Sequence, residues 1–431
     1  MVPLDRHFAK SVLRLLVFLM VLLFVQGICV SSANAQSYIF GRADFAVGNG
    51  PLAVAAGDLN GDGITDLVAV NSTDNTVSVL LGSANGTFAA PVNYPTGTYP
   101  ASVALGDFNR DGILDFAVTN ENCTQTLRQG LSCESGTVSV FVGNGDGTFR
   151  PKVDYATGAG PASVAVSDIN SDGNLDLVVA DVADGSVSIL LGNGDGTFQN
   201  QNAIQLEDNA GLNQLQGAIV VSDFNGDGNP DIAVGVYEAW ILLGNGDGTF
   251  QTPVSLDLTP VAYLAAGDFN HDGRMDLIAN GIVNGTVLLG NGDGTFIQDG
   301  TYSGGFVTVA DFNGDGHLDF SASTAVYLGN GDGTFQPALT YGTGPGPAGM
   351  AVGDFNGDGR LDLAVADSAS NTISILLGVA GGPFVGKTGY LTGGTPPPQG
   401  PNSIVLADFN NDASQTWQAP ITAPAVVFRS C

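Results

Sequence analysis

The sequence predicts an all-β protein, a seven-bladed β-propeller with four-stranded blades. Three observations lead to this fold class. Residues 354–362 read DFNGDGRLD, and seven complete copies of this acidic string, with small changes, occur along the chain. The shortest steps between copies are 43 residues, a length typical of a propeller blade. After residue 35 no convincing helical stripe occurs, whereas short runs rich in Val, Ile, Leu and Phe alternate with polar residues.

The first 35 residues have the layout of a secretory signal peptide. Three basic residues precede an apolar run over residues 15–25, and small residues follow at 33–35. We therefore expect a signal peptide at 1–35, a propeller at 36–412 and an irregular C-terminal tail at 413–431. The expected location is secreted, extracellular or at the cell surface, with the periplasm as an alternative.

The charge of the chain excludes some partners. Asp and Glu number 42 against 12 Lys and Arg, which gives a net charge of −30. Such a chain repels nucleic acid and anionic membrane surfaces. No apolar run after the signal peptide reaches the roughly 18 residues that span a bilayer. We expect a monomer with no nucleic-acid partner and no transmembrane segment after signal cleavage.

The third repeat illustrates how each unit divides into strands. PASVAVSD alternates before the acidic string, LDLVVA follows it, and GSVSILLGN forms the next run. The turn signal NGDG then leads into a fourth segment. These four runs predict four strands, with the acidic string between strands one and two.

The two ends of the repeat region bear on how the ring closes. Residues 37–50, SYIFGRADFAVGNG, resemble a fourth strand and its link to the next blade, without the three strands that should precede them. We expect this segment to complete the last blade and close the ring. An eighth string at Asp408, DFNNDASQT, lacks the glycine and the last aspartate. An eight-bladed or incomplete ring is therefore the alternative.

The acidic strings predict calcium sites. Each has aspartate at positions one, five and nine, asparagine at three and glycine at six. Carboxylates this close together repel one another unless a multivalent cation lies between them. Calcium takes six to eight oxygen ligands, and the EF-hand loop supplies them with similar spacing, including the main-chain carbonyl of position seven. Metal-free, Asx-rich turns are the alternative interpretation.

We expect about seven Ca²⁺ ions, each bound by the side chains of positions one, three, five and nine and the carbonyl of position seven. The candidate ligands are Asp58, Asn60, Asp62, Ile64, Asp66; Asp107, Asn109, Asp111, Ile113, Asp115; Asp168, Asn170, Asp172, Asn174, Asp176; Asp223, Asn225, Asp227, Asn229, Asp231; Asp268, Asn270, Asp272, Arg274, Asp276; Asp311, Asn313, Asp315, His317, Asp319; and Asp354, Asn356, Asp358, Arg360, Asp362. The recurring LGNGDGTF segments have a single carboxylate, so we interpret them as hairpin turns.

The D-x-N-x-D-G-x-x-D loop and the DLAV-like strand after it resemble those of FG-GAP and VCBS repeat proteins, over about residues 37–412. The blades of that family are similar to those of the integrin α-chain propeller. The resemblance implies a calcium-binding propeller at a cell surface or outside the cell, often tied to adhesion or carbohydrate contact. It implies no single activity.

Two cysteines lie ten residues apart in an insertion that only one repeat contains. Export makes an oxidising compartment plausible, so we predict a disulfide between Cys123 and Cys133. Two reduced surface thiols are the alternative.

The face opposite the acidic loops is the predicted binding face. In a four-stranded meander the one-to-two and three-to-four loops share one end, so the variable and inserted segments gather at the other. The aromatic candidates for ligand contact are Tyr94, Tyr99, Tyr237 and Trp240, each with plain packing as the competing interpretation.

We expect a binding or adhesion module for an extracellular protein or glycan, with a passive structural scaffold as the alternative. Catalysis is not expected. After the signal peptide the only histidines are His271 and His317, both at variable positions of acidic strings. The aspartate clusters are explained by calcium, although paired carboxylates of a carbohydrate-active enzyme are a less favoured alternative.

Overall fold

The computed structural model describes residues 42–126, 130–133, 135–206, 217–236, 238–281, 284–379, 405–407 and 416–418. All of them belong to the compact unit Phe40–Cys431. Their regular structure consists of strands without any helix, as the sequence predicts. Over these described residues there is accordingly no helix with the length and apolar character needed to cross a membrane.

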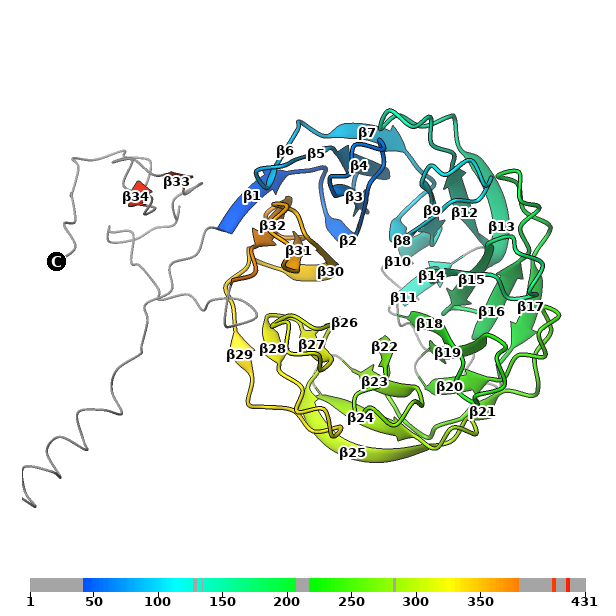
Figure 1. Ribbon diagram of the computed structural model, residues 1–431. Coiled ribbons are helices and arrows are strands. Elements are labelled where there is room, and N and C mark those ends of the chain that lie inside the picture. Colours follow the sequence, from blue (N-terminus) through cyan, green and yellow to red (C-terminus); the bar gives the residue numbers. More distant parts are fainter. Residues whose placement is uncertain are drawn as a thin grey trace, which may run out of the picture. The chain divides into compact units, whose positions relative to one another are not determined.

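Seven four-stranded antiparallel sheets form the blades of a ring (Figure 1). The predicted seven-bladed propeller is thus confirmed. Blades one to three consist of β2 (Pro51–Gly57), β3 (Asp66–Asn71), β4 (Thr76–Leu80), β7 (Val92–Pro95); β8 (Pro100–Gly106), β9 (Asp115–Asn120), β12 (Ser135–Phe141), β13 (Val153–Ala159); and β14 (Pro161–Ser167), β15 (Asp176–Asp181), β16 (Ser186–Leu190), β17 (Asn202–Gln205).

Blades four to seven repeat the same antiparallel meander. They consist of β18 (Ala218–Ser222), β19 (Asp231–Gly235), β20 (Ala239–Leu242), β21 (Val254–Ser255); β22 (Tyr263–Gly267), β23 (Asp276–Asn280), β24 (Asn284–Gly290), β25 (Phe296–Ser303); β26 (Val307–Ala310), β27 (Asp319–Ala322), β28 (Ala325–Tyr327), β29 (Leu339–Thr340); and β30 (Pro347–Gly353), β31 (Asp362–Asp367), β32 (Thr372–Leu376), with β1 (Arg42–Ala46) as the fourth strand.

Three short hairpins complete the regular structure of the described residues. Their strands are β5 (Gly82–Ser83) with β6 (Thr87–Phe88), β10 (Cys123–Thr126) with β11 (Gly130–Cys133), and β33 (Val405–Ala407) with β34 (Thr416–Gln418). The second of these hairpins is the insertion of blade two. The eighth acidic string at Asp408 lies outside the described residues.

The ring closes by pairing the start of the described chain with its last blade. Strand β1 runs antiparallel to β32, from Arg42 opposite Leu376 to Ala46 opposite Thr372. Blade seven therefore takes its outer strand from the N-terminal side of blade one, as the sequence predicts. Closing the ring in this way leaves no unpartnered blade at either end.

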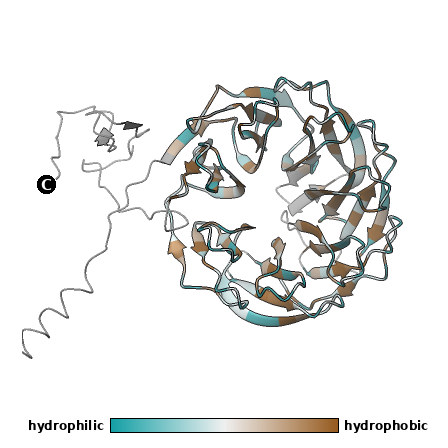
Figure 2. Cartoon of the chain, viewed as in Figure 1, coloured by the Kyte–Doolittle hydropathy of each residue, from teal (hydrophilic) through white to brown (hydrophobic). Residues whose placement is uncertain are grey.

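Apolar side chains fill the spaces between neighbouring blades. The second strand of every blade is buried at every residue. In β3 and β15 four consecutive apolar residues lie between polar residues at the two ends, so the run does not alternate. In Figure 2 the hydrophobic stretches fall mainly on strands and the hydrophilic ones on the connections. Position two of every acidic string adds a buried apolar side chain: Leu59, Phe108, Ile169, Phe224, Phe269, Phe312 and Phe355.

Ring closure should be sensitive to the apolar contact that β1 makes. The Phe45 ring lies edge-on to Phe88 of blade one, with 5.1 Å between the centroids, and packs on the core between blades seven and one. Phe45→Ala should lower the free energy of unfolding by about 2–3 kcal/mol, measured by chemical denaturation, because it leaves a cavity at the closing strand. Val92→Ala is the control, since Val92 also lies on an outer strand but is 53% exposed. Equal effects of both substitutions would contradict a special role for β1.

Candidate metal centres

The seven acidic loops lie on one face of the ring together with the NGDG turns. Each loop joins strands one and two of its blade, and each turn joins strands three and four. Contacts between neighbours confirm the shared face: Gly196 N in the turn of blade three donates to Phe108 O in the loop of blade two at 3.0 Å. Gly333 N of blade six donates in the same way to Phe269 O of blade five.

The carboxylate at position one organises the backbone of each loop. In blade one, Asp58 Oδ1 accepts from Gly61 N at 2.8 Å and Oδ2 accepts from Gly63 N at 2.8 Å. The bond from the position-six glycine recurs in all seven loops at 2.8 to 2.9 Å. Burial acts to raise the pKa of Asp58, but its backbone donors outweigh that effect and hold the pKa below its ordinary value.

Positions three and five face each other across the loop. Asn60 Oδ1 accepts from Asp62 N at 2.9 Å, and Asn60 Nδ2 donates to Asp62 Oδ2 at 3.1 Å. Asp62 Oδ1 in turn accepts from Ile64 N at 2.8 Å. The equivalent bonds occur in the other six loops. Backbone hydrogen bonds within the loop thus fix the side chains of positions one, three and five, and they do so whatever residue occupies position seven.

The carboxylate at position nine is placed differently. Asp66 is 0% exposed; its Oδ2 accepts from Leu59 N at 2.9 Å and its Oδ1 accepts from Gly82 N at 2.6 Å. All seven loops repeat this pair of bonds, one to position two and one to the glycine after strand three. Position nine therefore ties its loop to the end of the third strand, a role that the sequence interpretation missed.

Burial sets the electrostatics of position nine. It raises the pKa of all seven of these carboxyl groups, against the opposing effect of the two N–H donors. The pKa reaches about 6 in Asp115, Asp319 and Asp362. A cation close to the loop would favour the ionised form of these groups.

The donor atoms suit a hard cation, but the described residues do not form a compact cluster. They contain no group of three or more His, Cys, Asp or Glu side chains arranged to hold a metal ion. The reason is that each loop gathers only two carboxylates, at positions one and five, with one asparagine, while position nine turns to the backbone. In blade one, each carboxylate oxygen of Asp62 and Asp66 accepts one hydrogen bond and keeps further acceptor capacity, whereas Asp58 Oδ1 accepts three. Oxygen-only donors match calcium in chemistry.

The NGDG segments are hairpin turns, as predicted. In blade two, Asn144 N donates to Thr148 O at 2.9 Å, and Asp146 Oδ1 accepts from Thr148 N at 3.0 Å. Their single carboxylate is therefore occupied by the turn itself.

The repeat pattern corresponds to a known family. The FG-GAP-like repeat matches residues 58–118, 131–179, 168–234, 223–279, 321–365 and 354–414, which is well over half of the chain. The chain belongs to the FG-GAP-like repeat family. No curated protein is a significant match to its sequence.

Several solved structures are similar to this FG-GAP-like repeat protein. BBS1N in complex with ARL6DN is 14% identical with a TM-score of 0.52, over 77% of this chain and 94% of that one. An Agrocybe aegerita lectin that recognises non-reducing terminal N-acetylglucosamine is 24% identical with a TM-score of 0.46, over 67% of this chain and 80% of that one. Bacillus licheniformis rhamnogalacturonan lyase PL11 is 15% identical with a TM-score of 0.47, over 78% and 72%.

The opposite face of the FG-GAP-like repeats carries the insertion of blade two. Cys123 and Cys133 form a disulfide that joins the ends of hairpin β10–β11. Beside it, Glu121 N donates to Tyr99 O at 3.1 Å. Burial raises the pKa of Glu121 to about 8, and burial together with the Glu121 charge raises the pKa of Tyr99.

The four aromatic candidates for ligand contact have different positions. Tyr99 is half-buried on the opposite face, where its N–H donates to Asn75 Oδ1 at 2.7 Å. Tyr94 instead packs edge-on against Phe149, and Trp240 is 5% exposed in the core between blades three and four. These two expectations are corrected, because both side chains lie on strands and face a neighbouring blade. Tyr237 lies outside the described residues.

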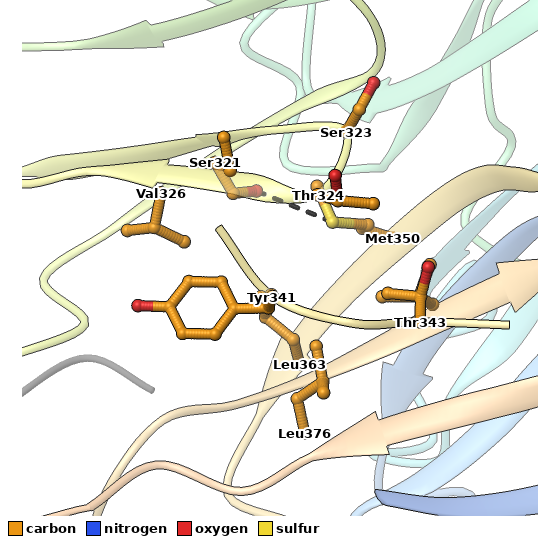
Figure 3. Close-up of a pocket in the computed structure, with 11 residues that line it drawn as sticks. Ser321, Ser323, Thr324, Val326, Tyr341, Thr343, Met350, Leu363 and Leu376 are labelled. Carbon is orange, nitrogen blue, oxygen red and sulfur yellow. Dashed lines mark hydrogen bonds between the residues drawn. The ribbon is translucent and has the colours of Figure 1, made fainter. Parts of the chain in front are cut away.

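A small cavity between blades six and seven offers no alternative site. Its walls include Tyr341, Met350 and Leu363, and Ser321 Oγ donates to Met350 Sδ at 3.5 Å (Figure 3). The space is about that of one water molecule, and the lining is mostly apolar.

The structural role of position nine can be separated from metal binding. Asp66→Asn replaces one acceptor oxygen with a donor NH₂ that faces a backbone N–H. The free energy of unfolding should fall by about 2–3 kcal/mol in EDTA, measured by chemical denaturation. Asp62→Asn is the matched control: it keeps Oδ1 for Ile64 N at the exposed position five, so stability in EDTA should change little. An unchanged Asp66→Asn protein in EDTA would show that its two hydrogen bonds contribute little.

Proposed function

We propose that this FG-GAP-like repeat protein binds about seven Ca²⁺ ions, one in each acidic loop. The observation that carries the proposal is the recurrence of one hydrogen-bonded scaffold in all seven loops, with oxygen donors on side chains one, three and five. A bound ion would supply positive charge between these carboxylates, with the carbonyl of position seven as a further ligand. Position nine would complete the set through acceptor capacity that its backbone bonds leave open.

The binding free energy of calcium in these loops would be large enough to give the ions a structural role. For a Kd of about 0.1 mM and about 1 mM calcium, each site contributes roughly 1.4 kcal/mol to folding stability. Seven such sites total about 10 kcal/mol, which is comparable to the net stability of a typical domain. The ions would also offset part of the net charge of −30.

Removal of calcium should destabilise all blades together, because it leaves carboxylates at positions one and five without a counter-ion. The melting temperature should fall substantially in EDTA. It should recover more with calcium than with magnesium, whose strict octahedral geometry suits these loops poorly. Calorimetry should find about seven ions per chain, and Asp227→Ala should remove one.

The control for this experiment is Asp247→Ala. Asp247 is an exposed carboxylate of the same blade and the same face, but its Oδ1 accepts from Thr249 N in an NGDG turn. The calcium stoichiometry should therefore stay unchanged. A wild-type chain that binds no calcium and melts identically in EDTA would show the loops to be metal-free turns.

We also propose that the opposite face binds an extracellular protein or glycan. The support is that this face carries the departures from the repeat: the disulfide-linked hairpin β10–β11, and the half-buried Tyr99 whose carbonyl accepts from the backbone N–H of the buried Glu121. Loops held on a rigid ring are a common location for recognition. Binding without catalysis, by a secreted or cell-surface monomer, is the function that fits this arrangement. A passive scaffold and a carbohydrate-active enzyme are the alternatives.

A glycan array probed with the calcium-loaded protein distinguishes these functions. Selective binding that Tyr99→Ala weakens about tenfold or more supports a binding module, since a buried aromatic contact contributes on the order of 1–2 kcal/mol. Asp247→Ala on the acidic face is the control and should leave binding unchanged. Release of a shortened glycan would instead indicate an enzyme, and neither binding nor release would favour the scaffold for this ligand class.

A further inference from the structure

Two histidines from neighbouring blades meet on the acidic face. His271 Nε2 and His317 Nδ1 lie 2.9 Å apart, and the centroids of the two rings are 5.1 Å apart. The residues are 46 positions apart in the sequence, at position four of loop five and position seven of loop six. The chain has only one other histidine, in the predicted signal peptide.

The ring itself directs position four toward the next blade. Position four has a left-handed backbone in every loop, with φ of 57° at His271, 61° at Arg110 and 74° at Gly61. The Arg110 side chain likewise reaches loop three, where its Nη2 lies 2.7 Å from the place that a Cβ on Gly173 would take. The meeting of His271 and His317 therefore follows from the regular spacing of the blades, and only this junction places imidazole on both sides.

We propose that His271 and His317 together bind a divalent transition-metal ion of the zinc class, which bridges blades five and six. Two nitrogens that bind one zinc ion at about 2.0–2.1 Å with tetrahedral geometry stand roughly 3.3 Å apart. The observed 2.9 Å needs to widen by only a few tenths of an ångström. The metal would take the place of the proton that the two ring nitrogens share in the hydrogen bond.

Water molecules can complete the coordination, since the described residues bring no third His, Cys, Asp or Glu side chain into a metal-binding group with the pair. The His317 ring lies against the NGDG turn of its own blade, with Nδ1 2.3 Å from the place that a Cβ on Gly331 would take. Asp332 follows in that turn, where its Oδ1 accepts from Thr334 N at 3.0 Å, so it provides negative charge near His317 and not a ligand. Zinc accepts two imidazoles with carboxylate or water in the remaining positions.

This site would select a different ion from the acidic loops. Imidazole nitrogen suits zinc, nickel and copper, whereas calcium prefers hard oxygen ligands. Zinc binding at this pair would not depend on calcium binding, because the two imidazole rings already lie within hydrogen-bond distance of each other. Calcium binding and zinc binding can therefore be measured separately on the same protein.

The experiment is a titration of the calcium-saturated full chain with Zn²⁺ at pH 7.5, followed by calorimetry and by the melting temperature. The wild type should bind one zinc ion and melt at a higher temperature with it. His271→Gly and His317→Asn should each weaken this binding roughly tenfold or more, since loss of a direct ligand costs at least as much as loss of an outer-shell partner. Both changes introduce residues that other loops carry at the same positions, such as Gly61 and Asn229, so the fold and the calcium stoichiometry should persist.

A transplanted pair provides the matched control. Ser171 and Asn229 occupy positions four and seven at the junction of blades three and four. The double substitution Ser171→His with Asn229→His should add a second zinc site. Absence of zinc binding to the wild type, or binding that both histidine variants retain at full affinity, would overturn the proposal and leave the histidines as a hydrogen-bonded contact between blades.

Discussion

The buried carboxylate at position nine is the constraint on which each blade depends. Asp66 and its six equivalents accept one N–H from the start of the acidic loop and another from the glycine after strand three. A buried charge without such donors would be costly, and unpaired N–H groups at the same point would be costly as well. The carboxylate therefore fixes the loop to the end of the third strand. Position two is fixed with it, so its apolar side chain enters the space between blades.

Much of the fold could be predicted because the same pattern of strands and turns recurs in seven repeats. Strand count, ring closure by β1, the NGDG hairpins and the common face of loops and turns all follow from the period and the turn residues. The role of position nine could not be predicted, since a sequence does not show whether a carboxylate faces an ion or a backbone N–H. Tyr94 and Trp240 were misplaced because each lies on a strand directly beside a variable loop: β7 ends at one and β20 begins at one. The meeting of His271 and His317 was hidden because it depends on the lateral register of two blades.

The two faces of the ring differ in how regular they are. On one face, seven near-identical loops repeat the same bonds within a few tenths of an ångström. The other face carries insertions of different length, including the disulfide-linked hairpin. Such a division is physically reasonable, since the regular side holds the blades in register and leaves the other side free to vary. Changes on the variable side then have little effect on the core.

The pairing of β1 with β32 has a consequence for the order of events during synthesis. Asp44 accepts a hydrogen bond from Ser374, its partner 330 residues later. At a ribosomal rate of about 5–20 residues per second, β1 waits roughly 15–65 s for the strand that it must join. Throughout that interval blade one lacks the neighbour that covers Phe45 and Phe88. The nascent chain therefore has an open apolar edge until almost the last blade is made, which is a period of vulnerability to aggregation.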